Sequence, residues 1–335
     1  MHVDDLPTPV LWADLDALEF NLNTMAERVP GTKLRPHVKA HKTTELARRQ
    51  HSLGHTGFTC ATAREVIGLA EAGLGDDLLF ANEMVDPRRL RAMAQCNGRV
   101  TVAVDSEETV DAAAAAGIEE VVVDLRVGFR CGCSVEEAGP LADRSRSAGM
   151  TVRGVMGYEG HAMGVPEIER RTELMSEAME RLLQAARVVG GDLITGGGTG
   201  THAINTHLTE IQAGSYVLMD TAYQMQVDQP FRQALFLQAS VVSVAPKFAV
   251  CDAGLKAQGM DHGDPTYPDG EVLYCSDEHT NIVADDDKID GPLRPGDRVT
   301  LVPAHVDPTM AKHEALHLVQ NSEVVDEWAI DLRHW

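Results

Sequence analysis

A cluster of cations at the end of a short strand-like run is the first group of residues that could do chemistry. Residues 35–42 read Arg-Pro-His-Val-Lys-Ala-His-Lys, and Lys39 stands near the end of the run that begins at Leu34. A lysine amine that is partly removed from water has a lowered pKa and can form a Schiff base with a carbonyl compound. The cluster therefore indicates a covalent site for such a compound, although a basic strand end that faces solvent has the same appearance.

A glycine-rich run is the second group. Residues 195–201 read Thr-Gly-Gly-Gly-Thr-Gly-Thr, and Gly214-Ser215-Tyr216 follows at the next strand-like run. Backbone amides in such a loop can bind an anion closely. The run lacks the Gly-Lys-Ser/Thr ending of a Walker loop and the glycine spacing of a dinucleotide fingerprint. It predicts a phosphate site of another kind, or a flexible turn.

The third group is His305-Val306-Asp307. On an extended strand the side chains of residues i and i+2 point to one side, so His305 and Asp307 could bind one cation. Imidazole with carboxylate suits Mn²⁺, Mg²⁺ or Zn²⁺, although an exposed pair without a metal is also compatible with the spacing. His161, in Gly157-Tyr158-Glu159-Gly160-His161, offers an acid–base group.

The elements that must position these groups alternate along the chain. Segments with helical patterns, such as 63–74 and 106–118, separate eight short strand-like runs. This alternation predicts an α/β fold, a (β/α)₈ TIM-type barrel, with a doubly wound open sheet as the alternative. Active sites of such barrels lie at the carboxyl ends of the strands. The eight runs are 34–39, 57–61, 78–82, 100–104, 121–125, 152–158, 192–196 and 211–218.

The alternation stops near Pro230. Strand-like runs at 239–244, 248–251, 298–303 and 314–320 follow, separated by Gly, Pro and Asp and with almost no helical periodicity. They predict a C-terminal antiparallel β domain, with the run 9–13 as an additional strand. We expect a barrel over 14–234, and a β domain over 1–13 and 235–335 that carries the metal pair.

Composition excludes several classes of function. The 335 residues include 29 Lys+Arg and 51 Asp+Glu, a formal charge of −22, which disfavours nucleic acid and anionic membranes as partners. The N-terminus lacks a signal-peptide pattern, and no apolar run approaches the roughly 20 residues of a membrane helix. Six cysteines are too few for a disulfide scaffold. We expect a reduced, soluble, cytoplasmic protein.

Seven motifs in order resemble one family. The chain contains RPHVKAHK, TCATAREV, GYEGH, TGGGTGT, TEIQAGSY, CDAGLKA and VPAHVDPT, and over residues 8–319 it resembles the D-threonine aldolase / D-serine dehydratase group. The resemblance implies the alanine-racemase-like fold of fold-type III pyridoxal-phosphate enzymes. It also implies a homodimer with sites near the subunit interface.

The resemblance assigns roles to single residues. Lys39 matches the lysine that holds pyridoxal 5'-phosphate covalently, and His37, His41 and Lys42 line the same motif. Gln212 stands where the racemases carry an arginine facing the pyridine nitrogen. Arg130 matches the arginine near the phenolic oxygen, with Arg126 as an alternative. The remaining cofactor contacts implied are Tyr158, Gly197, Gly198, Thr199, Gly214, Ser215 and Tyr216.

The metal pair distinguishes the reactions within the group. In the resemblance, the dehydratases of the group carry His-x-Cys at the metal, whereas the aldolases carry His-x-Asp. His305 and Asp307 therefore favour retro-aldol cleavage of a D-3-hydroxy amino acid to glycine and an aldehyde. His161 is the expected base. The alternatives are dehydration of D-serine or D-3-hydroxyaspartate, racemisation, and a non-catalytic pyridoxal-phosphate-binding protein.

Overall fold

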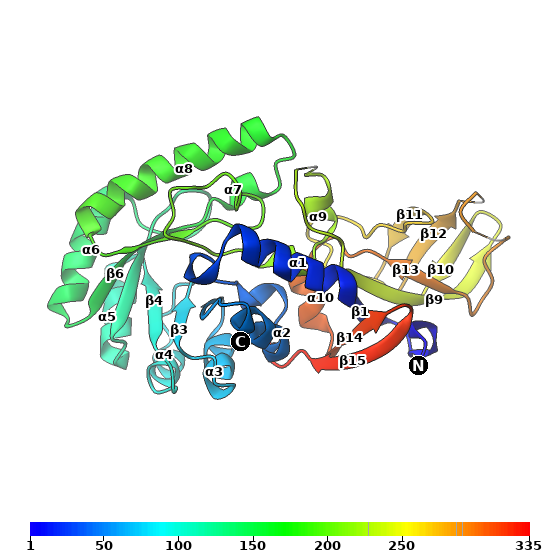
Figure 1. Cartoon of the computed structure of the whole chain (residues 1–335), viewed down its shortest axis with the longest axis horizontal. Coiled ribbons are helices and arrows are strands. Elements are labelled where there is room, and N and C mark those ends of the chain that lie inside the picture. Colours follow the sequence, from blue (N-terminus) through cyan, green and yellow to red (C-terminus); the bar gives the residue numbers. More distant parts are fainter. Residues whose placement is uncertain (227, 286, 290) are drawn as a thin grey trace.

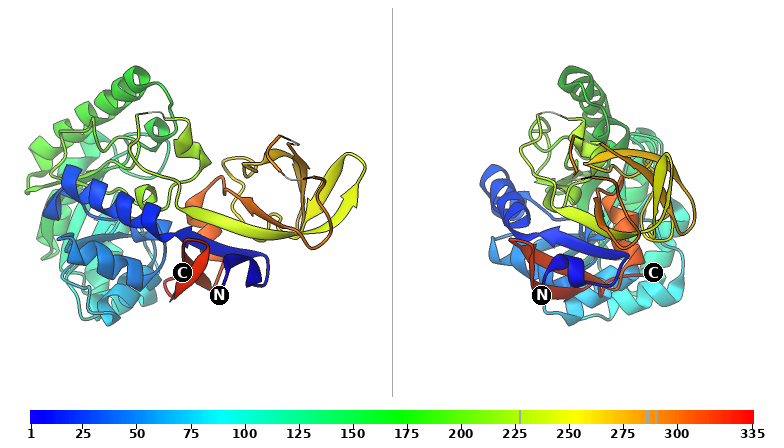
Figure 2. Two further views of the ribbon diagram at one scale, coloured as in Figure 1. Left: turned by 45° about the vertical axis from the view of Figure 1, so that its right-hand side comes forward. Right: turned by 90° about the vertical axis from the view of Figure 1, so that its right-hand side faces the viewer.

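The computed structural model describes residues 1–226, 228–285, 287–289 and 291–335. A barrel of strands and helices lies on one side and a β domain on the other, and the long strand β9 (Leu235–Ala245) extends from the barrel into the β domain (Figures 1 and 2). Among the described helices, none is long and apolar enough to cross a membrane.

The barrel wall is a parallel sheet with strand order β2-β3-β4-β5-β6-β7-β8. Residues 34–37 close it, because Leu34 bridges Ile211 of β8 and His37 bridges Thr59 of β2, both in parallel orientation. The predicted barrel is therefore correct. The strands are β2 (Gly57–Cys60), β3 (Asp77–Phe80), β4 (Val100–Val104), β5 (Glu120–Asp124), β6 (Thr151–Gly157), β7 (Leu193–Gly196) and β8 (Glu210–Ile211).

Two predicted strands were too long. The run 34–39 leaves the extended conformation after His37 and forms the 3-10 turn η3 (Val38–Ala40), so Lys39 lies on a turn above the barrel. The run 211–218 ends as a strand at Ile211 and continues into the 3-10 turn η4 (Ser215–Val217). Both turns begin where the pairing with neighbouring strands ends.

Helices cover the outside of the barrel, and their caps follow the sequence signals. Ser106 caps the amide of Thr109, and Gly117 ends the same helix with φ of 85°, a left-handed conformation that glycine adopts without strain. These helices are α1 (Leu15–Arg28), α2 (Thr44–Ser52), α3 (Ala63–Glu71), α4 (Pro87–Ala94), α5 (Glu107–Ala116), α6 (Val135–Ser147) and α8 (Ile168–Val189). Two short helices, α7 (Gly160–Met163) and α9 (Thr221–Gln224), lie instead at the carboxyl ends of the strands.

The β domain is an eight-stranded sheet with one parallel contact. β1 (Val10–Asp14) pairs antiparallel with β9 and parallel with β14 (Ala315–Gln320), so the run expected at 9–13 does join this sheet. The other strands are β10 (Phe248–Cys251), β11 (Gly270–Cys275), β12 (Thr280–Ala284), β13 (Arg298–Leu301) and β15 (Glu323–Ala329), and short 3-10 turns lie at η1 (Val3–Asp5) and η2 (Gly31–Lys33).

The domain also contains a helix that the sequence analysis did not predict. α10 (Val306–Lys312) begins directly after His305, so the expected extended strand through 305–307 was wrong. The carboxylate of Asp220 accepts a hydrogen bond of 2.9 Å from the amide of Val306, an orphan donor in the first turn of α10. This capping from the barrel joins the two parts of the chain near the carboxyl ends of the barrel strands.

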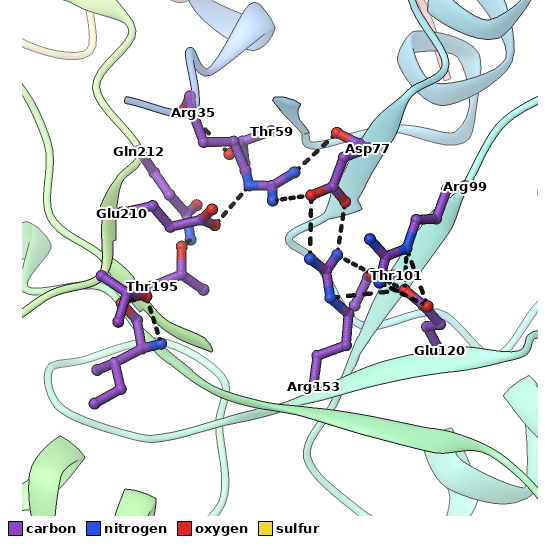
Figure 3. A network of polar contacts seen from close by, with 12 residues as sticks. Arg35, Thr59, Asp77, Arg99, Thr101, Glu120, Arg153, Thr195, Glu210 and Gln212 are labelled. Carbon is purple, nitrogen blue, oxygen red and sulfur yellow. Dashed lines mark hydrogen bonds and ion pairs between the residues drawn. The ribbon is translucent and has the colours of Figure 1, made fainter. Parts of the chain in front are cut away.

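A network of ion pairs fills the amino end of the barrel interior (Figure 3). Arg35 contacts Asp77 at 2.6 Å and Glu210 at 2.5 Å, and Arg153 contacts the other oxygen of Asp77 at 2.6 Å. Asp77 and Glu210 are the first residues of β3 and β8, so the network lies where the strands begin. The opposite end of the barrel is free of this network and contains a cavity.

Candidate active site

A cavity of about 590 Å³ lies at the carboxyl ends of the barrel strands, beside the β domain. It brings together almost every residue that the sequence analysis singled out, although they come from loops far apart in the chain. The predicted residues that line it are Lys39, Arg130, Tyr158, His161, Gly197, Gly198, Thr199, Gln212, Gly214, Ser215, His305 and Asp307.

Lys39 and Asp307 connect the barrel to the β domain within this cavity. The Nζ atom of Lys39 lies 3.6 Å from Oδ1 of Asp307. Burial disfavours the ammonium, but the carboxylate of Asp307, with a smaller contribution from Tyr158, outweighs this effect, so the pKa of Lys39 is raised. The lowered pKa that we expected from desolvation alone was therefore wrong, because the sequence does not show that a carboxylate faces the amine.

Tyr158 lies between two cations. Lys39 Nζ is 5.9 Å and the Arg130 guanidinium 5.8 Å from the centroid of its ring, and burial raises the pKa of its phenol. Arg130 lines the cavity and Arg126 does not, so of the two arginines considered, Arg130 is the one at the site.

The buried carboxylate of Glu159 holds the glycine loop. It accepts hydrogen bonds from the amide of Gly197 at 3.1 Å, the hydroxyl of Thr201 at 2.9 Å and the side-chain amide of Asn205 at 2.9 Å. The amide of Gly198 donates to the hydroxyl of Thr201. The amides of Gly197 and Gly198 are thus used within the loop, contrary to the cradle expected from the sequence.

Other amides remain for an anion. Within the described part of the chain, the backbone amides of Thr199, Gly214 and Ser215 donate to no acceptor. A Cβ atom on Gly214 would lie 2.6 Å from the carbonyl oxygen of His37, so only glycine fits between the two loops. The expected cradle is therefore available in part, from these three amides.

Two predicted cofactor contacts differ in their environment. Tyr216 is buried away from the cavity: its hydroxyl accepts from Gln50 at 3.1 Å, and its amide donates to the hydroxyl of Thr199 at 3.0 Å. Gln212 lines the cavity, and its amide nitrogen donates to Thr195 Oγ1 at 2.9 Å, which leaves its oxygen as a possible acceptor. Tyr216 therefore supports the loop from outside.

The residues around Lys39 have separate environments. His37 lines the cavity with a buried Nδ1 that has no partner among the described residues, and burial holds its pKa well below the usual value. His41 is fully buried, which lowers its pKa to about 4. Lys42 pairs at 2.5 Å with the buried carboxylate of Glu65 in α3. Only His37 faces the cavity.

The proposed metal pair lies at the start of α10. His305 Nε2 is 3.6 Å from Oδ2 of Asp307. Two ligands of one ion with metal–ligand bonds of about 2.1 Å lie about 3.0 Å apart at a right angle and about 3.4 Å apart at the tetrahedral angle. The observed separation is close to these values. The start of a helix therefore brings the two side chains together, as we had expected of a strand.

Sequence reasoning missed several residues at the site. Tyr223 and His262 line the cavity, and Asp261 contacts His305 Nδ1 at 2.7 Å. Glu159 appeared in a motif but without a role. The pair Asp261-His262, an acid next to a histidine in a turn-rich segment, was the available signal, yet nothing in the sequence relates it to His305.

The chain matches known families over almost its whole length. The model of the alanine racemase N-terminal domain matches residues 13–222, and a model of a serine dehydratase domain matches residues 234–319. The 3-hydroxy-D-aspartate aldolase of Paracoccus denitrificans (strain Pd 1222) is 34% identical and covers 99% of this chain and 94% of its own. The D-threonine aldolase of an Arthrobacter species is 34% identical, with 97% and 92% covered.

Two further relatives agree with this result. The crystal structure of D-threonine aldolase from Filomicrobium marinum superimposes with a TM-score of 0.92 at 31% identity, covering 99% of this chain and 97% of its own. The D-threo-3-hydroxyaspartate dehydratase of Delftia sp. (strain HT23) is 30% identical over 77% of this chain and 74% of its own. The chain therefore belongs to the D-threonine aldolase / D-serine dehydratase family of alanine-racemase-like proteins.

Proposed function

We propose that the protein is a carbon–carbon lyase that uses pyridoxal 5'-phosphate and a divalent metal to cleave D-3-hydroxy amino acids to glycine and an aldehyde. The observation that carries the proposal is the position of Asp307, which lies 3.6 Å from Lys39 Nζ through one oxygen and 3.6 Å from His305 Nε2 through the other. An amine for the cofactor and a metal pair for the 3-hydroxyl thus meet in one cavity, and the aldolase relatives support the same reaction.

The residues in the cavity fit pyridoxal phosphate. Lys39 supplies an amine for the aldehyde, and the unused amides of Thr199, Gly214 and Ser215 supply donors for the phosphate. Because Gly214 has no Cβ atom, two of these amides approach the segment 37–40, which carries Lys39. Gln212 lines the cavity and would contact the ring nitrogen of the cofactor. Arg130 and Tyr158 also line it and would contact the phenolic oxygen.

The proposed chemistry comes from the cofactor and the metal, and the residues of the cavity position them. Lys39 would hold pyridoxal phosphate, which would serve as the electron sink for Cα–Cβ cleavage, and His305 with Asp307 would hold a divalent ion, which would acidify the 3-hydroxyl. His161 is the proposed base for the hydroxyl proton, since its imidazole lines the cavity. Tyr158 and Arg130 would orient the bound cofactor.

Several finer assignments are also part of the proposal. Mn²⁺ or Mg²⁺ suits the imidazole–carboxylate pair, and Zn²⁺ is a further candidate. The family relation supports a homodimer, and the six free cysteines support a reducing, cytoplasmic location. The pairing of β1 with β9 and β14 supports a β domain over 1–13 and 235–335 beside a barrel over 14–234.

One assay tests the reaction. The purified protein with pyridoxal phosphate and Mn²⁺ is given D-threonine, D-serine and D-3-hydroxyaspartate, and all products are identified. Glycine with an aldehyde supports the proposal, and the Lys39→Ala variant is the control for the site. A 2-keto acid with ammonia would show instead the dehydratase reaction, which the dehydratase relative supports as the second candidate.

A further inference from the structure

We propose that Asp261 is the positioning residue of the metal site: its carboxylate holds the His305 ring so that Nε2, rather than Nδ1, is presented to the metal. This inference rests on the proposed metal site of His305 and Asp307. It concerns a residue that is remote in sequence from the metal motif and does not itself line the cavity.

The backbone fixes Asp261 beside His305. Gly259 forms an antiparallel bridge with His305, and its amide donates to Thr309 Oγ1 at 2.9 Å. The same hydroxyl donates to the carbonyl oxygen of His305 at 2.6 Å. A Cβ atom on Gly259 would lie 2.2 Å from Pro308 Cγ, so this close approach of the segment to α10 requires glycine.

The distance between Asp261 and His305 is that of a hydrogen bond and is shorter than the usual separation of two ligands of one ion. Nδ1 of His305 lies 2.7 Å from Oδ2 of Asp261. Two ligands of a common ion lie at least about 3.0 Å apart when the metal–ligand bonds are about 2.1 Å long and meet at a right angle or wider. Nδ1 therefore carries the proton and donates it to Asp261, which leaves the lone pair of Nε2 directed toward Asp307.

A second residue of the segment restrains the ring. The imidazole of His262 stacks on that of His305 with centroids 3.8 Å apart and an interplanar angle of 10°. Potential ligand atoms of Asp261, His262 and His305 lie within 4.8 Å of one another. The alternative hypothesis is therefore that a metal ion binds among these three residues. Such an ion would have to break the 2.7 Å hydrogen bond, and it would lie away from Asp307.

The prediction is measured as metal affinity, independently of turnover. The holoenzyme is titrated with MnCl₂, and free Mn²⁺ is followed by its electron paramagnetic resonance signal. We expect Asp261→Ala to weaken Mn²⁺ binding by about 10- to 100-fold, the range for loss of a carboxylate that orients a ligating histidine. Asp261→Asn should restore most of the affinity, because its amide oxygen still accepts the Nδ1 proton.

The controls separate this inference from a folding defect and from the proposed function. The Asp261 side chain is 56% exposed, so its removal leaves no buried cavity, and Asp277→Ala removes an exposed carboxylate of the same domain that should leave affinity unchanged. Equal affinity in Asp261→Ala and the unaltered protein would overturn the inference. Complete loss of binding in both Asp261 variants, as in His305→Ala, would make Asp261 a ligand and also overturn it. If the unaltered protein binds no Mn²⁺, the metal site of the proposed function itself is wrong.

Discussion

Replacing Glu159 by glutamine tests whether the glycine loop depends on one buried carboxylate. Glu159 is completely buried and accepts three hydrogen bonds, from Gly197, Thr201 and Asn205. Its oxygen Oε2 serves the Gly197 amide, and Oε1 serves the other two donors. Glutamine has nearly the same shape but only one acceptor oxygen, so one side of the group must present N–H to a donor.

The magnitude follows from the bonds that are lost. Glutamine satisfies most donors when its oxygen faces Thr201 and Asn205, and its NH₂ then opposes the Gly197 amide. The loss of one hydrogen bond to a charged group costs about 1.5–3 kcal/mol, and a buried unsatisfied donor costs about 1–3 kcal/mol. Even the lower end, about 2.5 kcal/mol, lowers the equilibrium constant for the observed loop conformation by roughly 50- to 100-fold, and this factor is the largest by which the apparent affinity for the cofactor can fall.

The assay is a titration of the apoprotein with pyridoxal phosphate, followed by the absorbance of the lysine-bound cofactor. We expect the dissociation constant of Glu159→Gln for pyridoxal phosphate to rise by about 10- to 100-fold, while Lys39 still reacts at saturation. The upper limit is the change in the equilibrium constant of the loop. Glu167→Gln, the same change at an exposed position close in the chain, is the control and should leave the constant unchanged. Equal affinities of Glu159→Gln and the control would refute the role of this carboxylate.

The remaining predictions concern the lysine, the metal, the ion-pair network and Tyr216. Lys39→Ala should abolish both the absorbance of the bound cofactor and turnover, with an unchanged circular dichroism spectrum. Removal of the metal with a chelator should abolish cleavage but leave the lysine-bound cofactor, and Mn²⁺ should restore the activity. Burial opposes the charge of Asp77, but hydrogen bonds from Arg153 and Arg35 lower its pKa to about 2 from 3.8, so the stabilisation it provides is complete above about pH 4 and is lost as the pH falls toward 2. The loss amounts to about 2 kcal/mol and is measured by urea unfolding across that range, where Asp77→Asn should lack this pH dependence. Tyr216→Phe should leave cofactor affinity within about twofold and cost about 1 kcal/mol of stability, the usual net contribution of one hydrogen bond, as measured by the same unfolding assay.

The barrel was predictable from the sequence because its buried parallel strands are apolar and alternate with capped helices. The ends of the elements were less predictable. Nothing local distinguishes residues 38–39 from the strand before them, and the chain turns there because its pairing with β2 and β8 ends at His37. α10 escaped prediction for a similar reason, since it spans only seven residues after a strand-like run and is capped by Asp220 from the barrel.

Part of the site was predictable from short sequence motifs, and part depends on contacts between residues far apart in the chain. Lys39, the glycine run and His305 with Asp307 are recognisable because their chemistry lies in short motifs. Asp261 contacts His305 across 44 residues of chain, so their relation exists only in the fold. The raised pKa of Lys39 is also a property of the fold, because its cause is a carboxylate from the other domain.

The acidity of the chain and its proposed anionic ligands are compatible because charge is arranged differently at the two ends of the barrel. At the amino end, Arg35 and Arg153 are matched by Asp77 and Glu210 and have no charge left for a ligand. At the carboxyl end, Lys39 and Arg130 line the cavity, and Asp307 is the carboxylate among the lining residues of the described chain. A divalent ion on Asp307 would neutralise even this charge, so the metal would make the cavity more favourable for an anionic substrate as well as supply its chemistry. The formal charge of −22 therefore describes the rest of the protein surface, where it disfavours polyanions, and not the cavity.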